Sequence, residues 1–226
     1  MLKISNLSFA RGNKLVLKKI NLSISHSEIV LIKGPNGSGK STLLSCLANF
    51  IEPLEGTVHY YSDLINPTIS SKNFIFISEE NYAYEDLSVL ENIHYWLTIN
   101  GVTPNDKAID RSINYLYSEL NINKKFLHLS FGQKRKLRML LLMLIDKPIW
   151  ILDDPFNGLD EESIKKLTKI ISMKRDQQLC NHPQRRNHHQ PRNHNQLQRS
   201  NHQQRRSHLE LCNHQQQRNH NWQCSN

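Results

Sequence analysis

The sequence predicts an α/β fold of the kind that binds nucleotide phosphates, and three features predict it. Residues 34–42 read Gly-Pro-Asn-Gly-Ser-Gly-Lys-Ser-Thr, which fits the phosphate-binding loop pattern of two glycines separated by four residues and followed by Lys-Ser. The apolar run 29–32 before the loop indicates a buried strand, and leucines at helical spacing follow the loop. A second apolar run, 149–152, ends in Asp153 and Asp154, where open α/β sheets bind ligands.

Each residue type in this loop has a chemical use. Glycines let the backbone curl so that successive N–H groups point at one oxyanion. Lys40 can reach the outer phosphates as a mobile charge, and the Ser41 hydroxyl can ligate Mg²⁺. Because a helix begins directly after the loop, its N-terminus should face the phosphates. The predicted phosphate-binding residues are Gly34, Pro35, Asn36, Gly37, Ser38, Gly39, Lys40, Ser41 and Thr42.

Composition divides the chain at residue 173. Residues 1–173 carry 20 Lys+Arg and 18 Asp+Glu, as in a globular domain with a sizeable core, whereas residues 174–226 carry 9 Lys+Arg against Asp176 and Glu210. The longest apolar run, 139–145, is too short to span a bilayer, and no N-terminal targeting segment is expected. The four cysteines form no CxxC pair, which favours a reducing cytoplasm.

Apolar patterning predicts the elements in order. Strands are expected at 2–9 and 20–24, at 57–61 as an antiparallel partner, and at 74–77 as a buried strand. Helices should then cluster between residues 88 and 145. The first helix should start at a capping box of Ser88 with Glu91 and stop at Asn100-Gly101. A second should start at Thr103-Pro104, and a third at a capping box of Ser130 with Gln133. Asp160 should cap a last helix.

Apolar residues at helical spacing predict which face of the second helix is buried. The helix that starts at Thr103-Pro104 should turn one face inward, formed by Ile109, Ile113, Leu116 and Leu120.

Two further motifs carry a family resemblance. The run Leu129-Ser130-Phe131-Gly132-Gln133, followed by Lys134-Arg135-Lys136, resembles the signature motif of ABC-transporter ATPases, usually Leu-Ser-Gly-Gly-Gln. Asn157-Gly158-Leu159-Asp160 resembles the D-loop of that family. The resemblance covers residues 1 to about 173. It implies a P-loop domain of the ABC type with a parallel core sheet, an antiparallel β subdomain and a helical subdomain at about 80–145, here lacking its C-terminal strands.

The resemblance also implies a site shared between two copies. In that family two nucleotide-binding domains pack head to tail, and the signature of one faces the γ-phosphate held by the other. The cofactors implied are ATP and Mg²⁺. Ser130, Gly132 and Gln133 would complete the partner's site, in line with the anion affinity of a helix start. Asp153 would join Ser41 in holding Mg²⁺, and Asp154 would act as the general base on water.

Three positions depart from the family pattern. Glu79 stands where a glutamine is usual, so a carboxylate would lie beside Mg²⁺ and the attacking water; we count it with Lys40 and Asp154 as a catalytic residue. Asp154 replaces a glutamate and is one methylene shorter. Because misplacing a base by about 1 Å can cost on the order of a hundredfold in rate, we expect slow hydrolysis with binding intact. Phe131 replaces a glycine of the signature.

Arg11 suggests a subfamily. An Arg-Gly pair stands near the place of the family's adenine-stacking tyrosine, and a guanidinium can also stack on a purine. The pair, and the run Leu-Glu-Asn-Ile-His-Tyr-Trp at 90–96, resemble the ATPase subunit of the haem exporter of cytochrome c biogenesis. The alternative is a solvated surface arginine.

The function implied by the resemblance is ATP binding and hydrolysis that drives export through a membrane permease. The partners expected are a second nucleotide-binding domain in a homodimer and integral-membrane permease subunits, with no nucleic acid. The chain would lie in the cytoplasm on the inner face of the cell membrane. Two alternatives stay open: a disabled domain that at most binds nucleotide, and a soluble ABC protein that acts on nucleic acid or ribosomes.

Residues 174–226 read as a low-complexity tail. They hold 8 of the 12 histidines, and Leu-Cys-Asn-His at 179–182 recurs at 211–214. Too few apolar residues are present to form the missing strand, so we expect disorder and no contribution to fold or catalysis. A metal-binding tract and a basic nucleic-acid arm are alternatives. We prefer a third hypothesis, repetitive DNA translated in a shifted frame after about Lys174.

Overall fold

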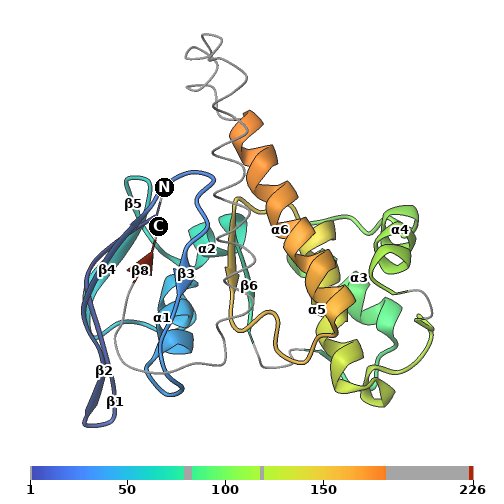
Figure 1. Ribbon diagram of the computed structural model, residues 1–226, viewed down its shortest axis with the longest axis horizontal. Coiled ribbons are helices and arrows are strands. Elements are labelled where there is room, and N and C mark those ends of the chain that lie inside the picture. Colours follow the sequence, from blue (N-terminus) through green and yellow to red (C-terminus); the bar gives the residue numbers. More distant parts are fainter. Residues whose placement is uncertain (1, 79–82, 118–119, 182–223, 226) are drawn as a thin grey trace.

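The computed structural model describes residues 2–78, 83–117, 120–181 and 224–225, with a β-rich part and a helical part (Figure 1). An antiparallel sheet in the order β2-β1-β4-β5 forms the β-rich part. Its strands are β1 (Leu2–Arg11), β2 (Lys14–Ile24), β4 (Glu55–Tyr60) and β5 (Asp63–Leu64). Leu2 lies opposite Ile24 of β2 and opposite Tyr60 of β4, so β1 is an inner strand of the sheet.

One face of this sheet packs on helix α1 (Lys40–Leu47). Leu2 and Ile4 alternate with more exposed residues, and a register shift between Ile4 and Leu7 brings Leu7 into the same core cluster. All three side chains are at most 2% exposed. Leu43 and Leu47 of α1 are buried in the same cluster. The helix that follows the phosphate-binding loop is therefore held by the antiparallel sheet.

A second sheet consists of two parallel strands, β6 (Phe74–Ile77) and β7 (Ile149–Leu152). Phe74 lies opposite Ile149 and Ile77 lies opposite Leu152, and the Asp153 N–H extends the pairing by donating to the Ile77 carbonyl at 2.8 Å. Helix α2 (Pro67–Asn73) leads directly into β6 and is capped by Asn66. Both strands thus end at one edge, which carries Asp153.

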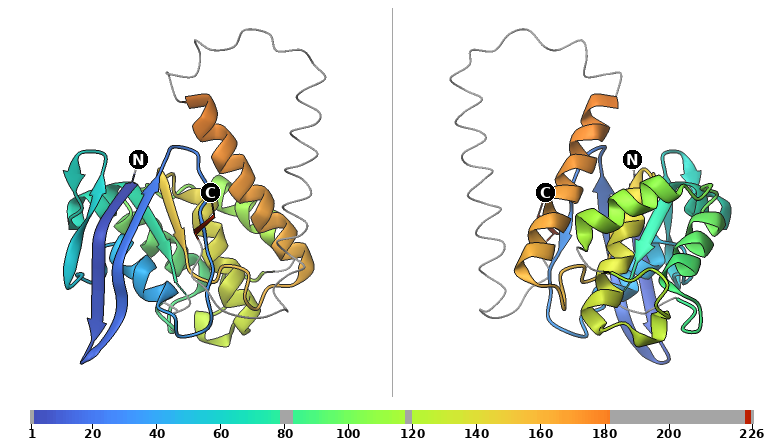
Figure 2. Two further views of the ribbon diagram at one scale, coloured as in Figure 1. Left: turned by 60° about the vertical axis from the view of Figure 1, so that its left-hand side comes forward. Right: turned by 90° about the vertical axis from the view of Figure 1, so that its right-hand side faces the viewer.

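The helical part holds the larger core. It contains α3 (Val89–Ile99), α4 (Asp106–Leu116), η1 (Phe126–His128), α5 (Phe131–Leu144) and α6 (Glu161–Asn181). Figures 1 and 2 show α6 beside α5, with its last turns extending beyond the body of the molecule. The side chains at its centre are at most 1% exposed: Val89, Ile93, Leu97, Ile109, Phe126, Leu137, Leu140, Ile145 and Leu167.

Most predicted elements are confirmed. Both capping boxes are present, at Ser88 with Glu91 and at Ser130 with Gln133, and Asp160 caps α6 by accepting from the Ser163 N–H at 2.8 Å. The second helix begins later than predicted: Asn105 is its N-cap, and the helix ends at Leu116, before Leu120. The short elements α2, β5 and η1 were not expected from the sequence.

The prediction of a buried strand at 29–32 is wrong in length and in burial. Only β3 (Leu31–Ile32) forms, and Ile29 and Leu31 are 43% and 42% exposed. Strands of parallel sheets are buried because neighbours flank them and helices cover both faces. Within the described ranges β3 pairs only with β8 (Cys224–Ser225), and β6 and β7 pair only with each other, so β3 lacks that environment.

Helix α6 continues past the domain boundary expected at residue 173. The Lys174 ammonium forms an ion pair with Asp146 and lies 5.7 Å from the Trp150 ring centroid. The Gln178 Nε2 donates to the Pro148 carbonyl at 2.5 Å. Disorder was expected for the whole of 174–226, and that prediction is wrong where the structure describes this region: residues 174–181 belong to α6, and residues 224–225 form β8 beside β3. The histidine-rich repeats at 182–223 lie outside the described residues.

We predict that the position of a C-terminal truncation decides its effect. A chain ending at residue 181 lacks β8, but that strand pairs with β3 over only two residues, so the thermal midpoint should stay close to that of the full chain. A chain ending at 173 should also lose the Lys174 and Gln178 contacts. One exposed ion pair and one hydrogen bond contribute together about 1–2 kcal/mol. The midpoint of the shorter chain should therefore fall by roughly 2–8 °C in thermal unfolding followed by circular dichroism. Equal midpoints would show that 174–181 does not stabilise the domain.

Candidate nucleotide-binding site

The phosphate-binding loop lies between β3 and α1, in a conformation that depends on glycine. Gly37 and Gly39 have φ values of +78° and +97°, in the region that L side chains disfavour. A Cβ atom on Gly39 would lie 2.8 Å from Val16 Cγ1 and 3.1 Å from Leu17 Cδ2, so β2 packs directly on the loop. The Ser38 N–H donates to the Pro35 carbonyl at 3.2 Å and closes the turn.

Lys40 reaches back over this loop. Its ammonium donates to the carbonyls of Gly34 and Pro35, at 2.9 and 3.1 Å. These bonds hold the positive charge against the first two residues of the loop, within reach of the segment where a phosphate would bind. An ammonium has three donors, so a bound phosphate can take one of them or replace a carbonyl.

The start of α1 is suited to an anion. The first helical bond runs from the Leu43 N–H to the Gly39 carbonyl, so the preceding N–H groups point outward as orphan donors. No acidic residue stands in the first turn to neutralise the positive end of the helix. Ser41 is exposed and its hydroxyl is open to a ligand, whereas Thr42 is only 9% exposed. Of the two hydroxyls, that of Ser41 is the better placed for Mg²⁺.

The carboxylates lie at the end of β7. Asp153 is half-buried and fixed by its backbone bond to β6, and Asp154 is exposed, with a φ of +49°. Helix α1 contacts β7, which places the phosphate-binding helix against the strand that carries these residues. The oxygen donors of Ser41 and Asp153 are of the kind that Mg²⁺ prefers, so the chemistry of the residues fits that ion.

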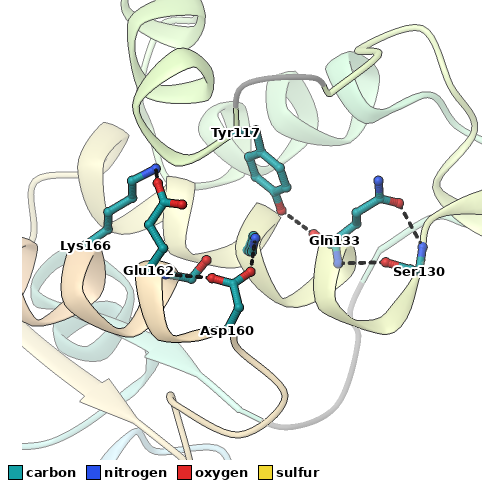
Figure 3. A network of polar contacts seen from close by, with 8 residues as sticks. Tyr117, Ser130, Gln133, Asp160, Glu162 and Lys166 are labelled. Atoms are coloured by element: carbon teal, nitrogen blue, oxygen red, sulfur yellow. Dashed lines mark hydrogen bonds and ion pairs between the residues drawn. The ribbon is translucent and has the colours of Figure 1, made fainter.

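The signature residues open α5. The Ser130 hydroxyl accepts from the Gln133 N–H at 3.2 Å, and Gln133 Oε1 accepts from the Ser130 N–H at 3.0 Å (Figure 3). The Tyr117 hydroxyl donates to the Gln133 carbonyl, and burial raises the pKa of that hydroxyl, so it remains a donor. Ser130 is exposed and still has its hydroxyl proton to donate to a ligand.

Two contacts tie the signature to the D-loop. The Lys136 ammonium binds the Asp160 carboxylate at 2.5 Å, and this hydrogen bond, with a further one from the Ser163 N–H, lowers the pKa of Asp160 well below its usual range. Phe131 is 55% exposed, and its ring packs on Gly158, where a Cβ atom would lie 2.4 Å from Phe131 Cε1. The aromatic side chain in the signature thus covers the D-loop glycine.

Some of the predicted site residues lie far from the phosphate-binding loop of the same chain. Figure 1 shows α1 and the start of α5 on opposite sides of β6, so the loop and the signature of one chain lie apart. Arg11 is exposed at the end of β1, opposite Lys14, and its stacking on a purine stays a prediction. Glu79, predicted as a catalytic residue and Mg²⁺ ligand, lies outside the described residues.

Two arginines beside this site were not predicted to be functional from the sequence. Arg135 and Arg138 of α5 are 5% and 7% exposed; the first donates to the Asp154 carbonyl and the second to the Ser78 carbonyl. The sequence did contain a signal for buried arginines: the two residues are three positions apart on a helix whose inward positions are otherwise mainly apolar. Such spacing places both guanidinium groups on one face of α5.

A glycine-dependent anion loop at a helix start, with carboxylates at the end of a neighbouring strand, defines a nucleotide-binding domain of the P-loop class. The ABC transporter family matches residues 17–157. The chain is 28% identical over 179 residues to the cytochrome c biogenesis ATP-binding export protein CcmA of Wolbachia pipientis wMel, covering 78% of this chain and 85% of the relative. It is 31% identical over 180 residues to the CcmA protein of Reclinomonas americana, covering 75% and 78%.

Structural comparison agrees. The structure is similar to that of the dimeric ATP-binding cassette MJ0796 bound to ADP and Pi, with a TM-score of 0.69, 25% sequence identity, and coverage of 79% of this chain and 84% of that one. The chain belongs to the ABC transporter family, as an ATP-binding subunit. No helix in the described part of the chain is long and apolar enough to cross a membrane.

We predict that Gly39→Ala destabilises the domain more than Gly37→Ala. Both changes force an L side chain into the left-handed region, at about 1–2 kcal/mol. Only Gly39→Ala also drives a methyl group into Val16 and Leu17, while the Cβ of Gly37 would meet open space. Thermal midpoints without nucleotide should fall by roughly 2–8 °C for Gly37→Ala and further for Gly39→Ala. Equal shifts would contradict the packing of β2 on the loop.

Proposed function

We propose that this protein binds and hydrolyses Mg-ATP and that a membrane permease uses the cycle to export a substrate. The observation that carries the proposal is the Lys40 ammonium held over its loop at an α1 start without acidic residues. Phosphate oxygens would be bound by the loop N–H groups and by Lys40. When bound, Mg²⁺ would offset phosphate charge, and Ser41 and Asp153 are the residues that would hold it.

Asp154 would act as the general base. It follows Asp153 at the end of β7 and is exposed, so water can reach its carboxylate. The shorter side chain places the carboxylate farther from the water than a glutamate would, and a base must lie within hydrogen-bond reach of its proton. Turnover is therefore slow. Glu79 would be a further carboxylate at the Mg²⁺ and water.

A second copy would complete the site. The separation of the loop from the signature in one chain supports a head-to-tail homodimer, because Ser130, Gly132 and Gln133 can then face the γ-phosphate of the partner. The hydroxyl proton of Ser130 and the start of α5 suit an anion. The proposed location is the inner face of the cell membrane, beside the permease.

The exported substrate is proposed from the relatives. The two CcmA proteins are cytochrome c biogenesis export proteins, and they match three quarters or more of this chain. Arg11 would then stack on the adenine. We infer export of haem for cytochrome c maturation as the transport reaction. The permease, not this subunit, would select the haem.

A nucleotide-binding domain without turnover is the second candidate. The observation in its favour is the isolation of β3, which pairs with β8 and, among the described strands, not with β6 or β7. A sheet interrupted at this point holds the loop and the carboxylates less firmly relative to each other. Nucleotide binding needs the loop and α1. It therefore depends less than hydrolysis does on the distance between the loop and the carboxylates.

We predict that Lys40→Ala abolishes stabilisation by Mg-ATP. Ligand at one hundred times its Kd stabilises a protein by about 2.7 kcal/mol, which raises the thermal midpoint of a chain of this size by roughly 5–11 °C. Lys33→Ala, which removes an exposed lysine just before the loop, should keep that shift in the same thermal assay. A folded wild-type chain without any shift would refute nucleotide binding.

We predict that Asp154→Asn lowers the rate of phosphate release from Mg-ATP and leaves the thermal shift with Mg-ATP within error. Asparagine tolerates the left-handed backbone at this position, so the change removes the charge and keeps the conformation. A well-placed general base contributes about a hundredfold to ten-thousandfold, and the shorter Asp154 side chain keeps only part of that contribution. The rate should therefore fall by roughly tenfold to a hundredfold. Asp110→Asn, on the exposed side of α4, is the control. Unchanged phosphate release in Asp154→Asn would exclude Asp154 as the base.

A further inference from the structure

Helix α5 buries two positive charges that the proposed function does not use. Arg135 and Arg138 are 5% and 7% exposed. Arginine is almost never buried to this degree unless it is paired, because taking a charge out of water is costly. Within the described residues the Arg135 Nη1 atom is buried without a hydrogen-bond partner. A charge retained at this cost needs a reason.

Each guanidinium binds a backbone carbonyl at the end of a parallel strand. Arg138 donates to the Ser78 carbonyl, just after β6, and Arg135 donates to the Asp154 carbonyl, two residues after β7. The arginines stand three positions apart, so both lie on one face of α5. The helix therefore holds the carboxyl edge of the β6–β7 sheet from one side.

The backbone at Asp154 needs such support. Its φ of +49° lies in the left-handed region, and the residue precedes Pro155, which restricts its backbone further. Backbone in such a conformation persists only where surrounding contacts determine it. Two contacts converge on the Asp154 carbonyl: the Arg135 guanidinium, and the Asn157 N–H at 3.2 Å.

We propose that Arg135 is a positioning residue for hydrolysis, which holds Asp154 in its left-handed conformation and so aims the Asp154 carboxylate at the attacking water. The inference rests on the proposed function of Asp154 as the base. Arg135 does not touch the substrate. Ser130 caps the N-terminus of α5, the end that would face a second copy. The same helix carries Arg135, which contacts the backbone of the proposed base.

The kinetic test uses Arg135→Met with a matched buried cation as control. Lys147 is 7% exposed and donates to the Ser71 carbonyl at 2.7 Å and the Asn100 carbonyl at 3.4 Å, near the other end of β7. In the full chain, Arg135→Met should lower kcat for Mg-ATP at least tenfold and change KM less than twofold. Lys147→Met should lower the thermal midpoint and leave kcat within twofold. An unchanged kcat in Arg135→Met would overturn the proposal, and so would an equal loss of kcat in Arg135→Met and Lys147→Met.

A thermal test does not depend on turnover. Glycine adopts the left-handed conformation without strain, so Arg135→Met should lower the thermal midpoint less in an Asp154→Gly background than in the wild type. Equal losses in both backgrounds would overturn the proposal. If Arg135→Met does not fold, Arg135→Lys keeps the charge but lacks the planar fork, and the same comparison applies. A wild type without turnover would refute hydrolysis, and with it the role of Asp154 as the base. The thermal comparison would then still show whether Arg135 holds the Asp154 backbone in its left-handed conformation.

Discussion

The parallel pairing of β6 with β7 is the constraint on which the candidate site depends. Ile77 lies opposite Leu152, and the bond from the Asp153 N–H to the Ile77 carbonyl continues the ladder by one residue. Both strands must therefore end at one edge, and the first carboxylate stands there on a rigid support. The chain leaves the sheet at Asp154, where φ changes sign.

Helix α5 connects this edge to the rest of the molecule. Its first residues form the signature, its apolar face enters the larger core through Leu137 and Leu140, and its arginines hold the strand ends. Lys136, on a third face, binds Asp160 at the start of α6. A displacement of α5 would move the D-loop and the carboxylates together, because the same helix contacts both.

Local signals in the sequence predicted the helix starts and most strands. A capping box needs only residues three apart, so Ser88 with Glu91 and Ser130 with Gln133 could be predicted without any tertiary contact. The same holds for the turn at Gly37 and Gly39. The strand at 29–32 was predicted wrongly because its burial depends on neighbours that come from elsewhere in the chain, and β3 has only β8 beside it in the described part. The contacts of Lys174 and Gln178 with residues 146–150 have no local signature either.

The sequence by itself determined the family, the phosphate-binding loop and the identity of the carboxylates after β7, because each is a property of residue type and short spacing. Only the tertiary structure decided how these parts are held. It placed Val16 and Leu17 against Gly39, turned Phe131 onto Gly158, and buried Arg135 beneath Asp154. These contacts join residues from 19 to 27 positions apart, and such distances close only when sheets and helices pack around a common core.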